Sequence, residues 1–166
     1  MIEILILYIL LPSKNTLYGI QKIIKDKFIH LNSATFGSLH PAVERLLKKG
    51  FVIDKKTLSD GGRKKNTYSI TKEGKEYLFA TLRADFSPKT SGIERQIALK
   101  LACSDILDVQ LRKELYTKTV RYYEYRVAVL QKLLKNKDYS DMQLEQIHLF
   151  IKNYESQINL LGNFLD

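Results

Sequence analysis

The order of elements between residues 36 and 78 constrains the fold most, because a helix, a hairpin and a second helix follow one another without a gap. Apolar residues recur at spacings of three and four from Phe36 to Leu47, which predicts a helix with one buried face. Gly50 then ends that helix, and a strand at 51–53 is followed by a return strand at 67–70. This order is typical of a winged helix-turn-helix.

Short motifs in this region resemble the PadR-like family of transcriptional regulators. GSLHPAV at 37–43 stands where the family reads roughly GSLYPAL, and KKGF at 48–51 stands at the end of that helix. GGRKK at 61–65 and YSITKEG at 68–74 are similar to the family's hairpin and to the start of its next helix, and YGI at 18–20 is similar to the start of its second helix. The resemblance covers about the first 80 residues and implies a winged-helix DNA-binding domain.

Two departures from the family pattern concern DNA contact. His40 stands where the family usually has tyrosine, and Asn66 and Thr67 replace more basic or aromatic residues. We expect these differences to alter details of DNA contact and to leave the fold unchanged.

Positive charge is concentrated in the N-terminal half of the chain. Residues 1–82 hold 14 Lys or Arg against 7 Asp or Glu, a net charge of +7, whereas residues 83–166 hold 13 against 11, a net charge of +2. Taken alone, this charge is as consistent with a basic face that only contacts water as with a surface that binds nucleic acid. A basic surface would also suit an anionic membrane. Together with the helix and the hairpin, it favours double-stranded DNA as the partner and no membrane.

The residues predicted to contact DNA lie on the second and third helices and on the hairpin. Short side chains near the start of the third helix are placed toward base edges, while the basic side chains are expected to contact phosphates. For Tyr18 and His40, the alternative is a role in packing within the protein. The predicted set is Tyr18, Ser33, Thr35, Ser38, His40, Arg45, Arg63, Lys64 and Lys65.

Helix signals divide the chain into two domains. Helices are expected at about 2–11, 17–28 and 72–86, with Thr16 and Thr71 as N-caps. The predicted fold is mainly α with a small antiparallel β-hairpin. Its expected parts are a winged helix-turn-helix DNA-binding domain at 1–86, a linker at 87–92 and a helical dimerisation domain at 93–166.

The C-terminal region carries a second regular pattern, in which apolar residues alternate spacings of three and four over about three heptads, as in a coiled coil. An earlier helix at about 109–137 has nearly the same rhythm, so the two are expected to form an antiparallel hairpin. A hairpin alone has too little core for both stripes, which favours a homodimer over a self-contained helical cap. The longer members of the PadR-like family, which this chain resembles, have such a dimerisation region. The residues predicted to dimerise are Leu144, Ile147, Ile151, Tyr154, Ile158, Leu161 and Leu165.

Other classes of protein find little support in the sequence. It contains no HExxH, no spaced set of metal ligands and no Walker motif, so we expect no enzyme, no cofactor and no metal. Cys103 is the single cysteine, which excludes a disulfide framework and fits a reducing cytoplasm. The apolar run at 1–11 is too short to span a bilayer and is expected to be the first core helix.

The PadR-like resemblance therefore implies a transcriptional repressor. We expect a homodimer on an inverted-repeat operator, controlled by an aromatic or other small-molecule effector. The alternative is a winged-helix protein-interaction module scaffolded by a coiled coil.

Overall fold

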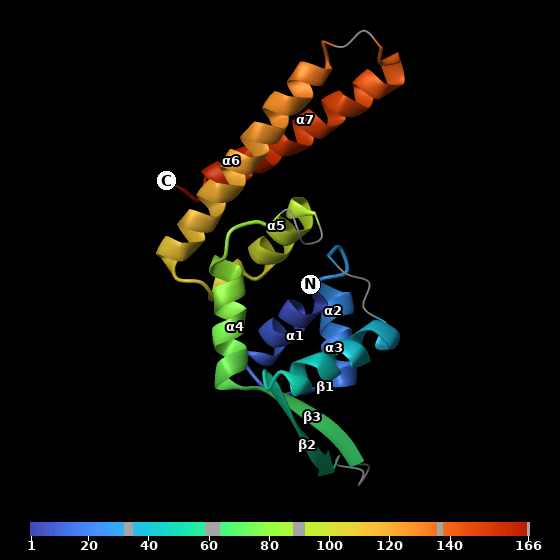
Figure 1. The fold of residues 1–166 in the computed structure, drawn as a ribbon, viewed down its shortest axis with the longest axis vertical. Coiled ribbons are helices and arrows are strands. Elements are labelled where there is room, and N and C mark those ends of the chain that lie inside the picture. Colours follow the sequence, from blue (N-terminus) through green and yellow to red (C-terminus); the bar gives the residue numbers. More distant parts are fainter. Residues whose placement is uncertain (32–34, 59–63, 88–91, 136–137, 166) are drawn as a thin grey trace. The chain divides into compact units, whose positions relative to one another are not determined.

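The computed structural model describes residues 1–31, 35–58, 64–87, 92–135 and 138–165 (Figure 1). They form two compact units, Met1–Ile106 (unit 1) and Leu107–Asp166 (unit 2). The predicted class, mainly α with a small antiparallel sheet, is confirmed. In the described part of the chain, no helix is long and apolar enough to cross a membrane. The elements are α1 (Ile2–Leu10), β1 (Asn15–Thr16), α2 (Leu17–Lys27), α3 (Phe36–Lys48), β2 (Val52–Leu58), β3 (Lys64–Ile70), α4 (Lys72–Arg83), α5 (Ile93–Ala102), the short 3-10 helix η1 (Ser104–Ile106), α6 (Val109–Leu133) and α7 (Asp141–Gly162).

Helix α1 is the centre of unit 1, as its apolar sequence predicts. It contacts α2, α3, α4 and β3, so apolar residues are buried all round it. Leu5, Ile6 and Leu7 are fully buried, and burying each such side chain contributes roughly 1.5–3 kcal/mol to folding. The remaining helices of unit 1 each place one apolar face on this core.

Side-chain caps fix where the surrounding helices begin. The Thr16 hydroxyl accepts a hydrogen bond from the Gly19 amide at 3.1 Å, and the Thr71 hydroxyl accepts one from the Gly74 amide at 3.0 Å. Both threonines are the predicted N-caps of α2 and α4. Gly50 ends α3 with a φ of 70°, a left-handed conformation that favours glycine.

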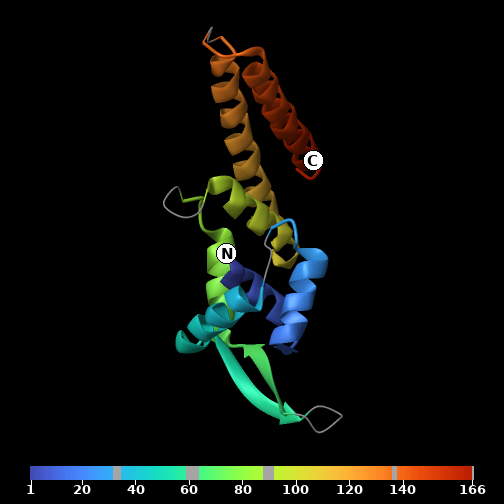
Figure 2. The ribbon, with the colours of Figure 1, turned by 90° about the vertical axis from the view of Figure 1, so that its right-hand side faces the viewer.

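The sheet has three antiparallel strands in the order β1-β3-β2. Strands β2 and β3 pair from Val52 opposite Ile70 to Leu58 opposite Lys64, and β1 adds two residues to the other edge of β3. The sequence placed Lys64 and Lys65 in the loop, but both belong to β3 because the ladder continues to that point. Figure 2 shows the hairpin projecting from the helices of unit 1.

Helix α4 packs at the base of this hairpin, where space is restricted. A Cβ atom on Gly74 would lie 2.1 Å from the carbonyl oxygen of Phe51, so only glycine fits there. The rings of Phe51 and Tyr77 stack beside it, with centroids 4.5 Å apart.

Helix α5 and η1 complete unit 1, so the compact units divide after Ile106. The predicted linker at 87–92 would instead place α5 in the C-terminal domain. The division into compact units does not test which residues bind DNA, so the predicted boundary of the DNA-binding domain stays a prediction.

Unit 2 is an antiparallel hairpin of α6 and α7, which lie side by side in both views (Figures 1 and 2). The two helices bury one stripe of side chains each, and the rings of Tyr123 and Tyr154 meet across the hairpin with centroids 5.2 Å apart. Ser140 and Gln143 form a capping box at the start of α7. We call this buried stripe the intrachain seam; its buried members are Leu115, Thr119, Tyr123, Ile147, Ile151, Tyr154 and Leu161.

Candidate nucleic-acid interface

The start of α3 is built by two of the residues predicted to contact bases. Thr35 is the N-cap, and its hydroxyl accepts a hydrogen bond from the Ser38 amide at 3.3 Å. The Ser38 hydroxyl in turn accepts from the Thr35 amide at 3.2 Å, which completes a capping box. Both side chains are exposed, so they can face a ligand, but their hydroxyls already stabilise the helix end.

The solvent side of α3 is a polar strip along the helix. Leu39, Ala42, Val43 and Leu46 are buried against the core, as the spacing predicts. The opposite side exposes the predicted His40 together with Pro41, Glu44 and Lys48. Because the 13-residue helix runs unbroken through Pro41, its exposed residues form one continuous strip.

Arg45 lies on the edge of this strip and is bound within unit 1. Its Nε donates to Glu3 Oε1 on α1 at 2.6 Å, and Lys49 Nζ lies 3.5 Å from Glu3 Oε2. Burial raises the pKa of Glu3, but the hydrogen bond from Arg45 and the charges of Lys49 and Arg45 outweigh it, so the pKa lies below its ordinary value. The Arg45 side chain is still 51% exposed, and its predicted contact with a phosphate stays a prediction.

Tyr18 stands at the start of α2 and is 67% exposed. It therefore lies on the surface, where Lys22 and Lys25 of the same helix are exposed as well. This placement leaves the hydroxyl accessible, as a phosphate contact requires.

The hairpin carries exposed lysines along both strands. Lys65 of β3 is exposed, and Lys55 and Lys56 of β2 are exposed in the same part of the ladder, opposite Thr67 and Asn66. Lys48, Lys55 and Lys56 were not among the predicted DNA contacts. The signal that could have identified Lys55 and Lys56 is their place in a hairpin strand opposite polar residues, and for Lys48 it is the place on the solvent side of α3. Ser33, Arg63 and the side chain of Lys64 lie outside the described residues.

Six of the residues predicted to dimerise lie on the face of α7 that packs on α6, and Leu165 follows the end of that helix. Ile147, Ile151, Tyr154 and Leu161 are buried in a single chain, and Leu144, Ile158 and Leu165 are half-buried. Their apolar pattern is thus accounted for by the intrachain seam. A contact with a second subunit through them stays a prediction.

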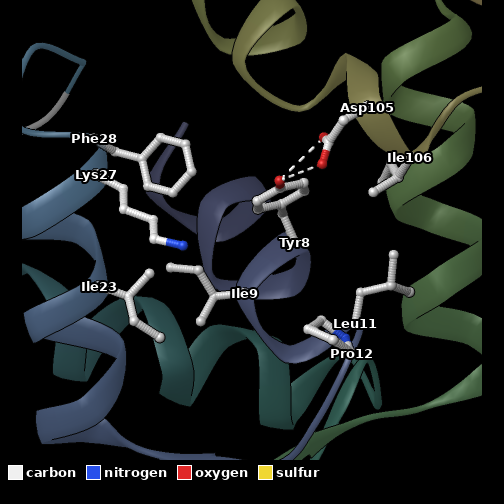
Figure 3. Close-up of a pocket in the computed structure, with 9 residues that line it drawn as sticks. All are labelled: Tyr8, Ile9, Leu11, Pro12, Ile23, Lys27, Phe28, Asp105 and Ile106. Atoms are coloured by element: carbon white, nitrogen blue, oxygen red, sulfur yellow. Dashed lines mark hydrogen bonds between the residues drawn. The ribbon is translucent and has the colours of Figure 1, made fainter.

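A cavity of about 370 Å³ lies within unit 1, between α1, the end of α2 and η1 (Figure 3). Ile9, Ile23 and Phe28 are among its apolar walls, and the side chain of Lys27 extends into it from α2. On the other side, the Tyr8 hydroxyl donates to the Asp105 carboxylate at 2.9 Å. Burial and the neighbouring carboxylate raise the pKa of Tyr8 to about 12, so the hydroxyl keeps its proton.

The described residues gather no group of three or more His, Cys, Asp or Glu side chains that could hold a metal ion. Cys103 is buried, and burial together with the charge of Asp105 raises the pKa of its thiol to about 12. Nucleophilic chemistry requires an accessible thiolate, and the Cys103 side chain is buried and keeps its proton.

Residues 6–80 match the family model described as "Transcriptional regulator PadR-like family". Among solved structures, the chain is similar to Bacillus subtilis PadR in complex with operator DNA, at 21% identity and a TM-score of 0.48 over 98% of this chain and 96% of that one. It is also similar to smu.1604c from Streptococcus mutans UA159, at 23% identity and a TM-score of 0.47 over 98% and 97%. No curated protein matches the chain.

Proposed function

We propose, from the match of residues 6–80 to the model of the PadR-like family of transcriptional regulators, that the chain is a sequence-specific DNA-binding repressor. The observation that carries the proposal is the juxtaposition in unit 1 of an exposed polar strip on α3 and exposed lysines on the hairpin, where Lys55 and Lys65 lie on one face of the sheet and Lys56 on the other. A recognition helix and a basic wing on one domain are the two parts that a winged helix uses on duplex DNA.

The two parts have different tasks in this proposal. Lys55, Lys56 and Lys65 neutralise phosphates and supply affinity that is independent of sequence. The first turns of α3, with Ser38 and His40, lie in the major groove and read base edges. The Tyr18 hydroxyl donates a hydrogen bond to a DNA phosphate and so positions the start of α2 on the sugar-phosphate backbone of the DNA.

We further propose that the chain acts as a homodimer. A two-fold dimer presents two copies of α3, so the operator should be an inverted repeat whose half-site centres lie about one helical turn apart, roughly 34–36 Å, or a multiple of it. The experiment is selection of duplex fragments by the purified full chain, followed by footprinting. We expect a palindromic footprint. Binding only to single strands, or a footprint on one asymmetric site, would favour the protein-interaction module instead.

The cavity in unit 1 is the site that we propose for a small-molecule effector. Its volume lies at the lower end of the range for ligand pockets, and its walls are mainly apolar with a few polar groups, as such pockets usually are. Lys27 would pair with an anionic group and Asp105 would accept a hydrogen bond from a donor at the other end, with the apolar side chains around a ring. This chemistry fits an aromatic acid with a second polar group.

Thermal melts of the full chain with benzoate and with 4-hydroxybenzoate test the effector site. We expect the hydroxylated acid to raise the melting temperature more and to change the affinity for the selected operator. Lys27→Met should abolish both effects, whereas Lys22→Met, on an exposed part of the same helix, should leave them unchanged. Equal responses of the two variants would refute this assignment and leave the DNA-binding proposal intact.

A further inference from the structure

The exposed side of α3 has a central row of residues, which we call the midline. It consists of Gly37, Pro41, Glu44 and Lys48, which are all exposed and recur at spacings of four and three. A Cβ atom on Gly37 would meet only the Thr35 hydroxyl, at 3.7 Å, so the packing of the chain leaves room for a side chain there. Gly37 and Pro41 offer a ligand no side-chain donor or acceptor. Glu44 is therefore the first residue of the midline whose side chain can form a hydrogen bond.

The carboxylate of Glu44 is not used within the described part of the chain. There, no hydrogen bond or ion pair involves Glu44 or Lys48, although the two lie one helical turn apart. The residues that follow each of them differ, because Glu3 binds both Arg45 and Lys49. The fold thus engages two cations beside the midline and leaves the midline carboxylate exposed.

A carboxylate at this place is unfavourable for binding to DNA in general. The side of α3 that we propose for the major groove would bring Glu44 between two rows of phosphates, and like charges repel. The repulsion is offset only where the carboxylate accepts a hydrogen bond from a base. Glu44 should therefore lower the affinity for most sequences and spare a few, which is how a repulsive group produces specificity.

The chemistry of the major groove identifies the base. An ionised carboxylate only accepts hydrogen bonds, and the groove displays two donors, the N4 amino group of cytosine and the N6 amino group of adenine. Adenine also displays the acceptor N7, which would repel the second carboxylate oxygen. Guanine and thymine display acceptors alone. Cytosine is thus the base whose edge suits a carboxylate.

We propose that Glu44 determines specificity by accepting a hydrogen bond from N4 of a cytosine in the operator. This assignment rests on the proposed DNA-binding function and deepens it, because it names a base and a residue that the predicted DNA contacts did not include. Lys48, one turn further along the midline, lowers the repulsion between Glu44 and the phosphates.

A panel of altered operators tests the contact. The operator selected by the full chain is changed one base pair at a time, and fluorescence anisotropy measures the affinity for each duplex. We expect the wild type to lose at least about five-fold in affinity when one particular C·G pair is changed, the lower end for a base contact. Glu44→Ala should lose the preference at that pair alone, and it should bind random duplex no more weakly than the wild type.

Glu44→Gln is the sharper variant, because glutamine keeps the size of the side chain and adds a donor. Glutamine pairs with N6 and N7 of adenine, so we expect the preferred base at that position to change from cytosine to adenine. A residue that only stabilised α3 would not change which base is preferred. Glu76→Gln, at an exposed carboxylate on α4, is the control and should keep every preference of the wild type.

The possible failures are distinct. A wild type that binds selected and random duplexes equally would overturn the DNA-binding proposal and this assignment together. If the wild type selects an operator but Glu44→Ala and Glu44→Gln keep its preference at every base pair, the assignment of Glu44 alone is overturned. A preference of the wild type for adenine that Glu44→Ala loses would overturn the choice of cytosine.

Discussion

Unit 1 and unit 2 bury their apolar residues in different ways. In unit 1 the apolar side chains surround α1, and many of them are wholly inaccessible to water. In unit 2 each helix contributes only one buried stripe, and Met142, Leu149 and Leu160 remain exposed. Unit 1 therefore has a closed core of its own, whereas unit 2 leaves a second group of large apolar side chains exposed.

Charge separates the two units as well. Residues 1–106 hold 18 Lys or Arg against 10 Asp or Glu, a net charge of +8, and residues 107–166 hold nine against eight, a net charge of +1. A closed core with a basic surface suits a polyanion, while a nearly neutral helical hairpin suits association with protein. The comparison teaches that the proposed affinity for DNA and the proposed affinity for a second copy would belong to different parts of this chain.

The largest effect should come from the core of unit 1. Leu5→Ala removes a fully buried side chain of α1 that has neighbours on every side, so we expect the free energy of unfolding to fall by about 2–5 kcal/mol. Ile29→Ala, at a side chain that is 67% exposed, should change it by less than about 0.5 kcal/mol. Urea denaturation measures both. Similar losses for the two variants would show that the core is not closed.

A smaller loss is expected where α4 meets the hairpin. Gly74→Ala forces a Cβ atom against the Phe51 carbonyl, and the movement that relieves the contact should cost about 1–3 kcal/mol. Gly37→Ala is the control, because its Cβ would meet only the Thr35 hydroxyl at 3.7 Å and alanine favours a helix. If Gly74→Ala were neutral in urea denaturation, the packing of α4 on the hairpin would be looser than the structure shows.

Much of unit 1 could be predicted from sequence because local signals agree with packing. The caps Thr16 and Thr71 and the helix stop at Gly50 are all present where the sequence indicated them. Strand β1 was not predicted, because two residues carry no periodic pattern and pair only once β3 is in place. The bounds of α5 were not predicted either, since its start at Gly92 has no side-chain cap.

The candidate sites were less predictable because periodicity does not say what covers a face. The stripe from Leu144 to Leu165 was assigned to a hairpin with the preceding helix and in part to a second subunit. The structure shows the packing against α6 of the same chain, and the contact with a second subunit stays a prediction. Ser38 and Arg45 were selected as DNA contacts from their positions, and the structure shows that each also holds unit 1 together. Hydrogen bonds and ion pairs of this kind depend on which side-chain atoms come close together. The spacing of residues in the sequence is compatible with several different partners for each side chain.

The charge difference between the units predicts which lysines bind DNA. Replacing Lys55, Lys56 and Lys65 by alanine should remove up to three phosphate contacts per subunit, and each lost contact should flatten the salt slope of binding by about 0.9. Arg63, Lys64 and Lys65 replaced together should act in the same direction. Fluorescence anisotropy with specific and random duplexes measures the slope.

The control for the wing variants is the removal of Lys132, Lys135 and Lys152, which are exposed in unit 2. We expect it to leave the slope nearly unchanged. An equal loss from unit 2 would mean that DNA binding is spread over both units, and an unchanged slope with lost specificity would mean that the wing reads bases.

Ser38→Ala should have a still smaller effect, with two parts. Loss of the capping box should lower the stability of unit 1 by about 0.5–1 kcal/mol, measured by urea denaturation. If the hydroxyl also faces a base, affinity for the selected palindrome should fall by about a further 1 kcal/mol, with almost no change for random DNA. A stability loss without any change in binding would restrict Ser38 to the helix cap.

The smallest expected effect is the pH dependence of the ion pair between α1 and α3. The pKa of Glu3 in the folded chain is lowered from 4.5, so its ionised form stabilises the fold above that value, and this contribution is lost as the pH falls through the folded-state pKa. Because Arg45 is half exposed, Glu3→Gln should cost less than about 1 kcal/mol at pH 7 and almost nothing well below pH 4. Urea denaturation at both pH values measures it, with Glu44→Gln, an exposed carboxylate on α3, as control. A cost that persisted at low pH would mean that Glu3 stabilises unit 1 by packing. In that case the ion pair would hold Arg45 only weakly, and Arg45 would remain available to bind a phosphate.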